Sequence, residues 1–208
     1  MIPEIIFIGT ILFFAVVVHE YAHGWVAYKL GDPTAKLAGR LTLNPLMHVD
    51  PVGTIFLPGV LIVLRLLGMN TFLFGWAKPI PVNFLRLNNP RRDMILVGLA
   101  GPAVNVILAV AISQLTWLLP MSSAVYKLVE TAVFINLLLA TFNMIPIPPL
   151  DGSRLVMGLL PRQLAVLYSR LERYGILIVI LFVYMGIVNT VVIPIVEWGG
   201  RLLGVPFS

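Results

Sequence analysis

Residues 11–30 read Ile-Leu-Phe-Phe-Ala-Val-Val-Val-His-Glu-Tyr-Ala-His-Gly-Trp-Val-Ala-Tyr-Lys-Leu. The apolar run around them extends from about Ile5 to Leu30, which is long enough for a helix to cross a membrane. It ends at Gly31-Asp32-Pro33, a sequence that stops helices. Ionisable groups at membrane depth are costly and are usually functional. The polar side chains inside this run therefore predict a functional site in a membrane helix; they are His19, Glu20 and His23.

The composition of the whole chain also favours a membrane protein. Of its 208 residues, 59% are hydrophobic and 11% are charged, whereas about a quarter of a soluble domain is charged. The chain has no cysteine, so a zinc site in it would use histidines and carboxylates. No basic patch interleaved with aromatic residues occurs, which argues against a nucleic-acid partner.

Further apolar segments predict more membrane helices. The spans expected with full length are Met94–Leu119, interrupted at Gly101-Pro102, then Tyr126–Met144 and Tyr174–Val196. Val52–Leu67 is short, Met69–Pro90 reads as loop or extended chain, and Ser153–Arg173 is amphipathic. We therefore expect an all-α polytopic membrane protein in one domain, residues 1–208, with about four to six membrane segments.

The spacing of the two histidines predicts a metal site. Residues four apart lie on one face of a helix, so His19 and His23 can bind the same ion. Glu20 completes an H-E-x-x-H motif, in which the carboxylate acts as a base towards water. The alternative is a pair of histidines near a helix end that reach the membrane interface.

A catalytic zinc needs a third protein ligand and an open position. The candidates are His48 and the acidic residues, of which Asp50 lies in a polar loop. Asp151 follows a proline-broken run, and broken backbone at membrane depth is tolerated where it lines a cavity. An Asp at this place can equally cap the helix that begins at Ser153, and the residues alone leave the two roles open. His48 is more typical of a loop residue.

Two motifs together resemble the site-2 protease family of intramembrane zinc metalloproteases. They are the early His19-Glu20-x-x-His23 and the late Asn143-x-x-Pro146-x-x-x-Leu150-Asp151-Gly152. Gly101-Pro102-Ala103-Val104-Asn105 resembles the family's central helix. Gly39–Pro45, Gly53-Thr54 and Gly75–Pro79 resemble its compact subgroup, which lacks PDZ and CBS domains.

The resemblance implies one zinc ion per chain, with His19, His23 and Asp151 as ligands and Glu20 as base. It implies an endopeptidase that cuts membrane proteins at a transmembrane segment. Asn105 and Asn143 are amides in apolar helices, which either bond neighbouring helices or hold the substrate. Met69–Pro90 is expected to offer a strand edge to the unwound substrate.

The proposed ligands also impose a topology. His19 and His23 lie towards the end of one helix and Asp151 follows the end of another, so both ends must face the same side. The region from Val52 to Pro90 then makes no net crossing and forms a re-entrant or extended hairpin between the first and central helices. With this topology only three of the 14 basic residues lie opposite the site; they are Arg65, Lys127 and Arg201. The positive-inside rule then places the site towards the cytoplasm and the N-terminus outside the cell membrane.

Two other functions fit parts of the pattern. A membrane zinc protease of the Ste24 type would need a glutamate as third ligand, and no glutamate lies in a comparable helix after the motif. A metal-binding transporter or inactive scaffold would not need the base Glu20.

Overall fold

The computed structural model describes residues 2–69, 75–118 and 122–207. Within these residues it is helical and has no β-strand. Three helical stretches are long and apolar enough to cross a membrane, namely Ile6–Lys29, Pro90–Leu118 and Ser123–Asn143. A bent pair, Arg162–Tyr184 and Val188–Leu202, makes up to four. The chain is thus an all-α polytopic membrane protein, as the sequence predicted.

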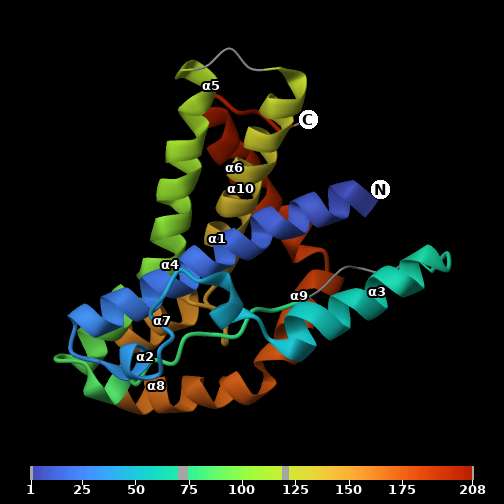
Figure 1. Cartoon of the computed structure of the whole chain (residues 1–208). Helices are drawn as coiled ribbons and strands as arrows, with labels where there is room; N and C mark the ends of the chain where they lie inside the picture. Colours follow the sequence, from blue (N-terminus) through green and yellow to red (C-terminus); the bar gives the residue numbers. More distant parts are fainter. Residues whose placement is uncertain (1, 70–74, 119–121, 208) are drawn as a thin grey trace.

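Three long helices form the centre of the molecule. They are α1 (Ile2–Lys29), α4 (Pro90–Ser113) and α6 (Ser123–Asn143), and α4 packs against both of the others. Figure 1 shows α4 and α6 side by side, with α1 crossing them at an angle. The short α5 (Leu115–Leu118) follows α4, and α10 (Ile193–Leu202) packs on α6 around buried Val133 and Val196.

The segment between α1 and α4 folds back on itself. It holds α2 (Thr34–Leu37), η1 (Pro45–His48), a π-helical turn η2 (Pro51–Phe56), α3 (Leu57–Leu66) and η3 (Phe84–Arg86). The Trp76 amide donates to the Gly53 carbonyl at 3.1 Å, so the chain returns beside the start of the excursion. This confirms the expected hairpin; residues 70–74 of the expected extended segment lie outside the described residues.

The central helix α4 differs from its expected form in two ways. It begins at Pro90 rather than Met94, because proline suits a first helical turn and Asp93 accepts the Asn89 amide at 2.8 Å. The expected interruption at Gly101-Pro102 is wrong, since Pro102 lies inside a continuous helix. Neighbouring helices and local adjustments let membrane helices tolerate an internal proline.

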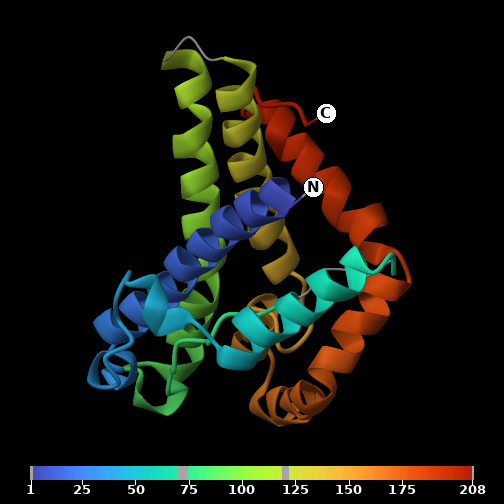
Figure 2. The same cartoon turned by 45° about the vertical axis from the view of Figure 1, so that its right-hand side comes forward.

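The C-terminal region is more broken than the sequence suggested. The amphipathic piece is divided into α7 (Gly152–Leu159), α8 (Arg162–Ser169) and η4 (Arg170–Tyr174), because Pro161 cannot continue α7. The last span, expected over 174–196, is broken in the structure. It comprises α9 (Gly175–Tyr184), η5 (Val188–Val192) and α10, bent by 69°. Gly186 lies at the bend with φ +73°, a conformation that glycine adopts readily; Figure 2 shows the bend.

Candidate metal centre

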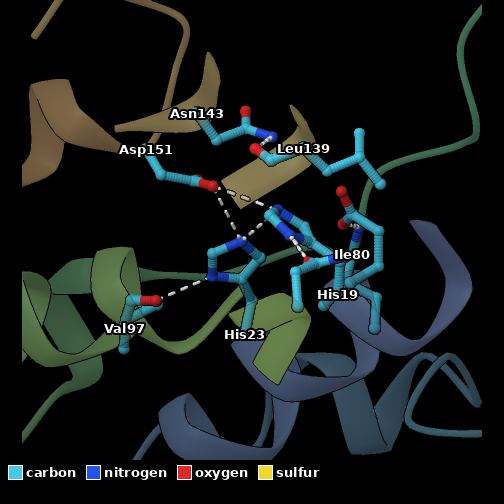
Figure 3. Close-up of polar contacts among 9 residues, drawn as sticks. His19, His23, Ile80, Val97, Leu139, Asn143 and Asp151 are labelled. Carbon is cyan, nitrogen blue, oxygen red and sulfur yellow. Dashed lines mark hydrogen bonds and ion pairs between the residues drawn. The ribbon is translucent and has the colours of Figure 1, made fainter. Parts of the chain in front are cut away.

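Two histidines and one aspartate converge between α1, α4 and the start of α7 (Figure 3). The side chains of His19 and His23 project from α1 and are nearly buried. His19 Nε2 lies 3.0 Å from His23 Nε2 and 3.0 Å from Asp151 Oδ2. His23 Nε2 lies 3.3 Å from the same carboxylate oxygen. Three potential ligand atoms therefore form one tight triangle.

A chain of buried amides fixes the proton on His19. Asn136 Nδ2 donates to the Ala132 carbonyl at 2.9 Å, so Asn136 Oδ1 is the atom that accepts from Asn105 Nδ2 at 3.0 Å. Asn105 Oδ1 then faces His19 Nδ1 at 2.6 Å. An amide oxygen only accepts, so Nδ1 of His19 carries the proton and Nε2 presents a lone pair to the triangle.

His23 is oriented in the same sense by backbone. Its Nδ1 lies 2.7 Å from the Val97 carbonyl oxygen on α4, which can only accept, so this nitrogen also carries the proton. A metal-binding histidine usually donates the N–H of its other ring nitrogen, the one that does not bind the metal, to a neighbouring acceptor. Both imidazoles therefore direct Nε2 lone pairs at each other and at a carboxylate.

The triangle fits a zinc ion. Two imidazole nitrogens and a carboxylate oxygen that face one another form a donor set that a cation would hold together. Ligands at zinc–ligand bonds of about 2.0–2.2 Å in a tetrahedral site lie roughly 3.3 Å from one another, close to the observed separations.

The two open roles of Asp151 are separated by its geometry. The residue does occupy the N-cap position of α7, but its side chain makes no capping hydrogen bond there. The carboxylate points to the imidazoles instead (Figure 3). The following Gly152 is packed so tightly that an added Cβ would lie 2.3 Å from the Met144 carbonyl oxygen. This close approach brings Asp151 back beside the end of α6.

Gly101 on α4 lies against both imidazoles of the site. A Cβ added there would lie 2.4 Å from His23 Nε2 and 2.5 Å from His19 Nε2. Any side chain at this position would enter the space between the two imidazoles. The space between the imidazoles therefore requires glycine at residue 101.

Glu20 lies beside the triangle and not in it. Its Oε2 accepts the backbone amide of Ile80 at 2.8 Å, and Ile80 belongs to the extended segment that returns from α3. The Ile80 side chain is buried against Gly24 on α1. The extended segment therefore holds the Glu20 carboxylate beside the triangle, and Glu20 follows His19 directly in the sequence.

The other candidates for a third ligand lie elsewhere. His48 is fully buried, and its Nε2 donates to the Thr42 carbonyl at 2.8 Å. Asp50 caps η2 by accepting the amides of Val52 and Gly53. Both residues stabilise the loop before the hairpin, and the structure does not bring either into the cluster of His19, His23 and Asp151.

The two asparagines have different environments. Asn143 is half-buried near Asp151 (Figure 3), and its Nδ2 donates to the Leu139 carbonyl of its own helix at 3.0 Å. Asn105 is fully buried, and both ends of its amide are bonded within the protein. Asn105 thus bonds side chains of two neighbouring helices, His19 on α1 and Asn136 on α6, which is one of the two roles that the sequence left open. The sequence did not predict a role for Asn136, which accepts from Asn105. A further amide in an apolar helix belongs to no motif that would have indicated such a role.

Comparison with known proteins identifies the group to which this site belongs. The profile of peptidase family M50 matches residues 7–123 and 118–186. The chain belongs to peptidase family M50. This confirms the resemblance to the site-2 proteases. No solved structure shows significant similarity to the chain.

Individual relatives agree with the M50 assignment. The chain is 39% identical over 175 residues to YwhC of Bacillus subtilis, covering 79% of this chain and 74% of that protein. It is 28% identical over 182 residues to Rip2 of Mycolicibacterium smegmatis, covering 86% and 67% respectively. It is 25% identical over 159 residues to MJ0392 of Methanocaldococcus jannaschii, covering 76% of this chain but 36% of that protein. All three are named as zinc metalloproteases. This M50 member is accordingly a zinc metalloprotease with zinc as its cofactor.

Proposed function

We propose that the chain, as one membrane domain over residues 1–208, is an intramembrane zinc endopeptidase. It hydrolyses peptide bonds in or near the transmembrane segments of other membrane proteins. The observation that carries this proposal is the place of the metal centre. His19 and His23 are nearly buried within a helix long and apolar enough to cross the bilayer. A site at that depth meets substrates that lie in the membrane.

The side chains around the triangle divide the chemistry among them. His19, His23 and Asp151 hold the ion, which when bound polarises the scissile carbonyl and makes water acidic enough to be deprotonated near neutral pH. Glu20 takes the proton from the attacking water and passes it to the leaving amine. The Ile80 amide, 2.8 Å from Glu20 Oε2, keeps this carboxylate in place for both transfers.

Asn105 and Asn143 serve different partners in this proposal. Asn105 orients His19, because its amide is buried and bonded on both sides. Asn143 contacts the substrate, which is one of the two roles that the sequence left open. Its side chain is half-buried near Asp151, and its amide nitrogen bonds only a carbonyl of its own helix. Its oxygen and second N–H can therefore turn to a peptide group.

The extended segment 75–82 binds the unwound substrate along one edge. Successive residues of an extended chain direct their backbone groups to opposite edges. The amides of Trp76, Lys78 and Ile80 all bond inward, to Gly53, His48 and Glu20. The other edge carries residues 77, 79 and 81, of which the two prolines have no N–H. This edge therefore accepts substrate amides at three carbonyls and donates only from Ala77. Ala77→Pro removes this one donor and should lower cleavage if the edge binds substrate. Ile80→Pro is a less suitable variant, because it would also remove the amide that holds Glu20.

The site faces the cytoplasm in this proposal, and the N-terminus lies outside. Figure 1 shows α2, α7 and α8 at one end of the molecule and α5 with the C-terminus at the other. The end that holds α2, α7 and α8 contains most of the basic residues, among them Lys36, Arg91, Arg154 and Arg162. The positive-inside rule assigns that end to the cytoplasm.

Glu20→Gln is the variant that tests the proposed activity. Loss of the base should lower cleavage by about 100-fold or more, while the zinc remains bound because Glu20 lies outside the triangle. The measurement is a comparison of membrane proteomes from cells with the wild-type chain and with Glu20→Gln. Substrates should accumulate uncut in the variant. Identical proteomes, or zinc transport that persists in both cells, would contradict a protease and favour a transporter.

A further inference from the structure

The segment that leads to Asp151 has no regular secondary structure that would fix the position of this residue. This ligand arm, residues 145–151, contains Pro146, Pro148 and Pro149, which have no backbone N–H. Its only internal backbone bonds are Ile147 to Ile145 and Leu150 to Ile147. The position of the Asp151 carboxylate therefore depends on what contacts the arm from outside.

On one side, α4 holds the arm by its contacts with Asp151 and with α7, the helix that follows the arm. Arg91 Nε donates to the Gly158 carbonyl at 2.8 Å, and Arg91 Nη2 donates to the Leu160 carbonyl at 2.7 Å. Gly98 lies so close that an added Cβ would be 3.1 Å from the Asp151 carbonyl oxygen. These contacts fix α7 on α4, which also carries Gly101 against the two histidines.

The other side of the arm is held by the chain that leads into the last membrane segment. Tyr168 on α8 donates its hydroxyl to the Pro146 carbonyl at 2.6 Å. Gly175, the first residue of α9, packs so closely that an added Cβ would lie 2.6 Å from Pro149 Cδ and 2.7 Å from the Pro148 carbonyl oxygen. Pro148 is fully buried as a result.

An ion pair adds a third contact from the same segment. Arg154, three residues after Asp151, binds Glu172 of η4 with nitrogen–oxygen distances of 2.7 and 3.5 Å. The Arg154 side chain is 21% exposed and that of Glu172 is 43% exposed. A partly exposed pair contributes little energy by itself, but this pair joins the first turn of α7, directly after Asp151, to η4.

We propose that Tyr168, Glu172 and Gly175 form a clasp that sets the position of the Asp151 carboxylate in the metal centre. They are positioning residues and not catalytic ones, and the proposal rests on Asp151 being a metal ligand. Metal sites need their ligands placed to about half an ångström, which a proline-rich arm does not provide alone. The clasp also links the last membrane segment, through α8 and α9, to the metal centre; Figure 1 shows α8 beneath α7.

Tyr168→Phe tests the clasp by removing one hydroxyl. The full chain would be purified in detergent, and its zinc affinity measured by competition with a chromophoric chelator. We expect the affinity to fall about tenfold, in the range found for residues that support metal ligands. The visible spectrum of the cobalt-substituted chain should change as well, since it reports ligand geometry. Tyr184→Phe is the matched control because Tyr184 is 88% exposed on α9, and it should leave both measurements unchanged.

A charge exchange provides an independent test. Arg154→Glu and Glu172→Arg should each weaken zinc binding by about threefold, as expected for a partly exposed pair. The double variant should recover most of that loss. Unchanged zinc affinity and cobalt spectrum in Tyr168→Phe, with only a lower thermal midpoint, would overturn the clasp and leave a purely structural contact. Full zinc binding by Asp151→Ala would overturn the metal centre, and the clasp with it.

Discussion

At the scale of single residues, the feature that distinguishes this site is the neutral amide of Asn105, which orients His19. Many metal-binding histidines donate to a carboxylate, but here Asn105 Oδ1 lies 2.6 Å from His19 Nδ1 and Asn136 stands behind it. All three side chains are buried. A carboxylate in this place would add a buried charge, which is costly at membrane depth, whereas two linked amides satisfy one another.

This arrangement predicts different outcomes for the two asparagines of the site. Asn105→Ala should lower zinc affinity by about 10- to 100-fold, because it leaves His19 Nδ1 without its partner. Asn143→Ala should keep the zinc affinity of the wild type and lose cleavage, because Asn143 bonds only its own helix. Chelator competition and a cleavage assay on the same preparations would measure both. Equal zinc affinity in the two variants would remove the orienting role of Asn105.

The sequence indicated the residues that cluster at the candidate metal centre more clearly than the residues that hold them in place. The four-residue spacing of His19 and His23 places two imidazoles on one helical face regardless of tertiary structure. Asp151 remained open because an Asp before a helix also caps it, and only the folded chain shows where its carboxylate points. The contact between Ile80 and Glu20 joins residues far apart in the chain, so no local pattern could have indicated it.

At the scale of elements, the proline-rich arm determines where α6 ends and how Asp151 is presented. Replacing Pro148 and Pro149 together by Ala should allow α6 to extend, which rotates Asp151 by about 100° for each residue added. We expect the double variant to remain in the membrane and to lose both zinc affinity and cleavage. Pro206→Ala, at an exposed position after α10, is the matched control. Normal zinc affinity in the double variant would show that the clasp alone places Asp151.

The sequence predicted that the long helices exist, but it did not predict where helices are broken. Hydropathy identified α1, α4 and α6, since an apolar run of that length has few alternatives in a membrane. It could not show the 69° bend between α9 and α10, because apolar residues continue through the bend and the one local signal is Gly186, which has a positive φ. Conversely, Gly101-Pro102 looked like a break, yet α4 continues through it.

At the scale of the whole molecule, the proposed topology requires that the histidines and Asp151 share one side of the membrane. Single cysteines can test this cleanly because the chain has none of its own. Cysteines at exposed Ala38, Arg86 and Arg162 should react from the cytoplasm, and one at Ser122 from outside. Arg40 is unsuitable, since it is buried and donates to the Lys78 carbonyl. Labelling of positions 38 and 162 from opposite sides would contradict the shared side.

The central claim is that His19, His23 and Asp151 together hold one catalytic zinc, and zinc content per chain tests it most directly. The purified wild type and Glu20→Gln should each contain one zinc ion, and only the wild type should cleave. His19→Ala, His23→Ala and Asp151→Ala should each lose the ion while remaining folded in detergent. Full zinc occupancy in Asp151→Ala would contradict the account, because it would mean that the third ligand is another residue.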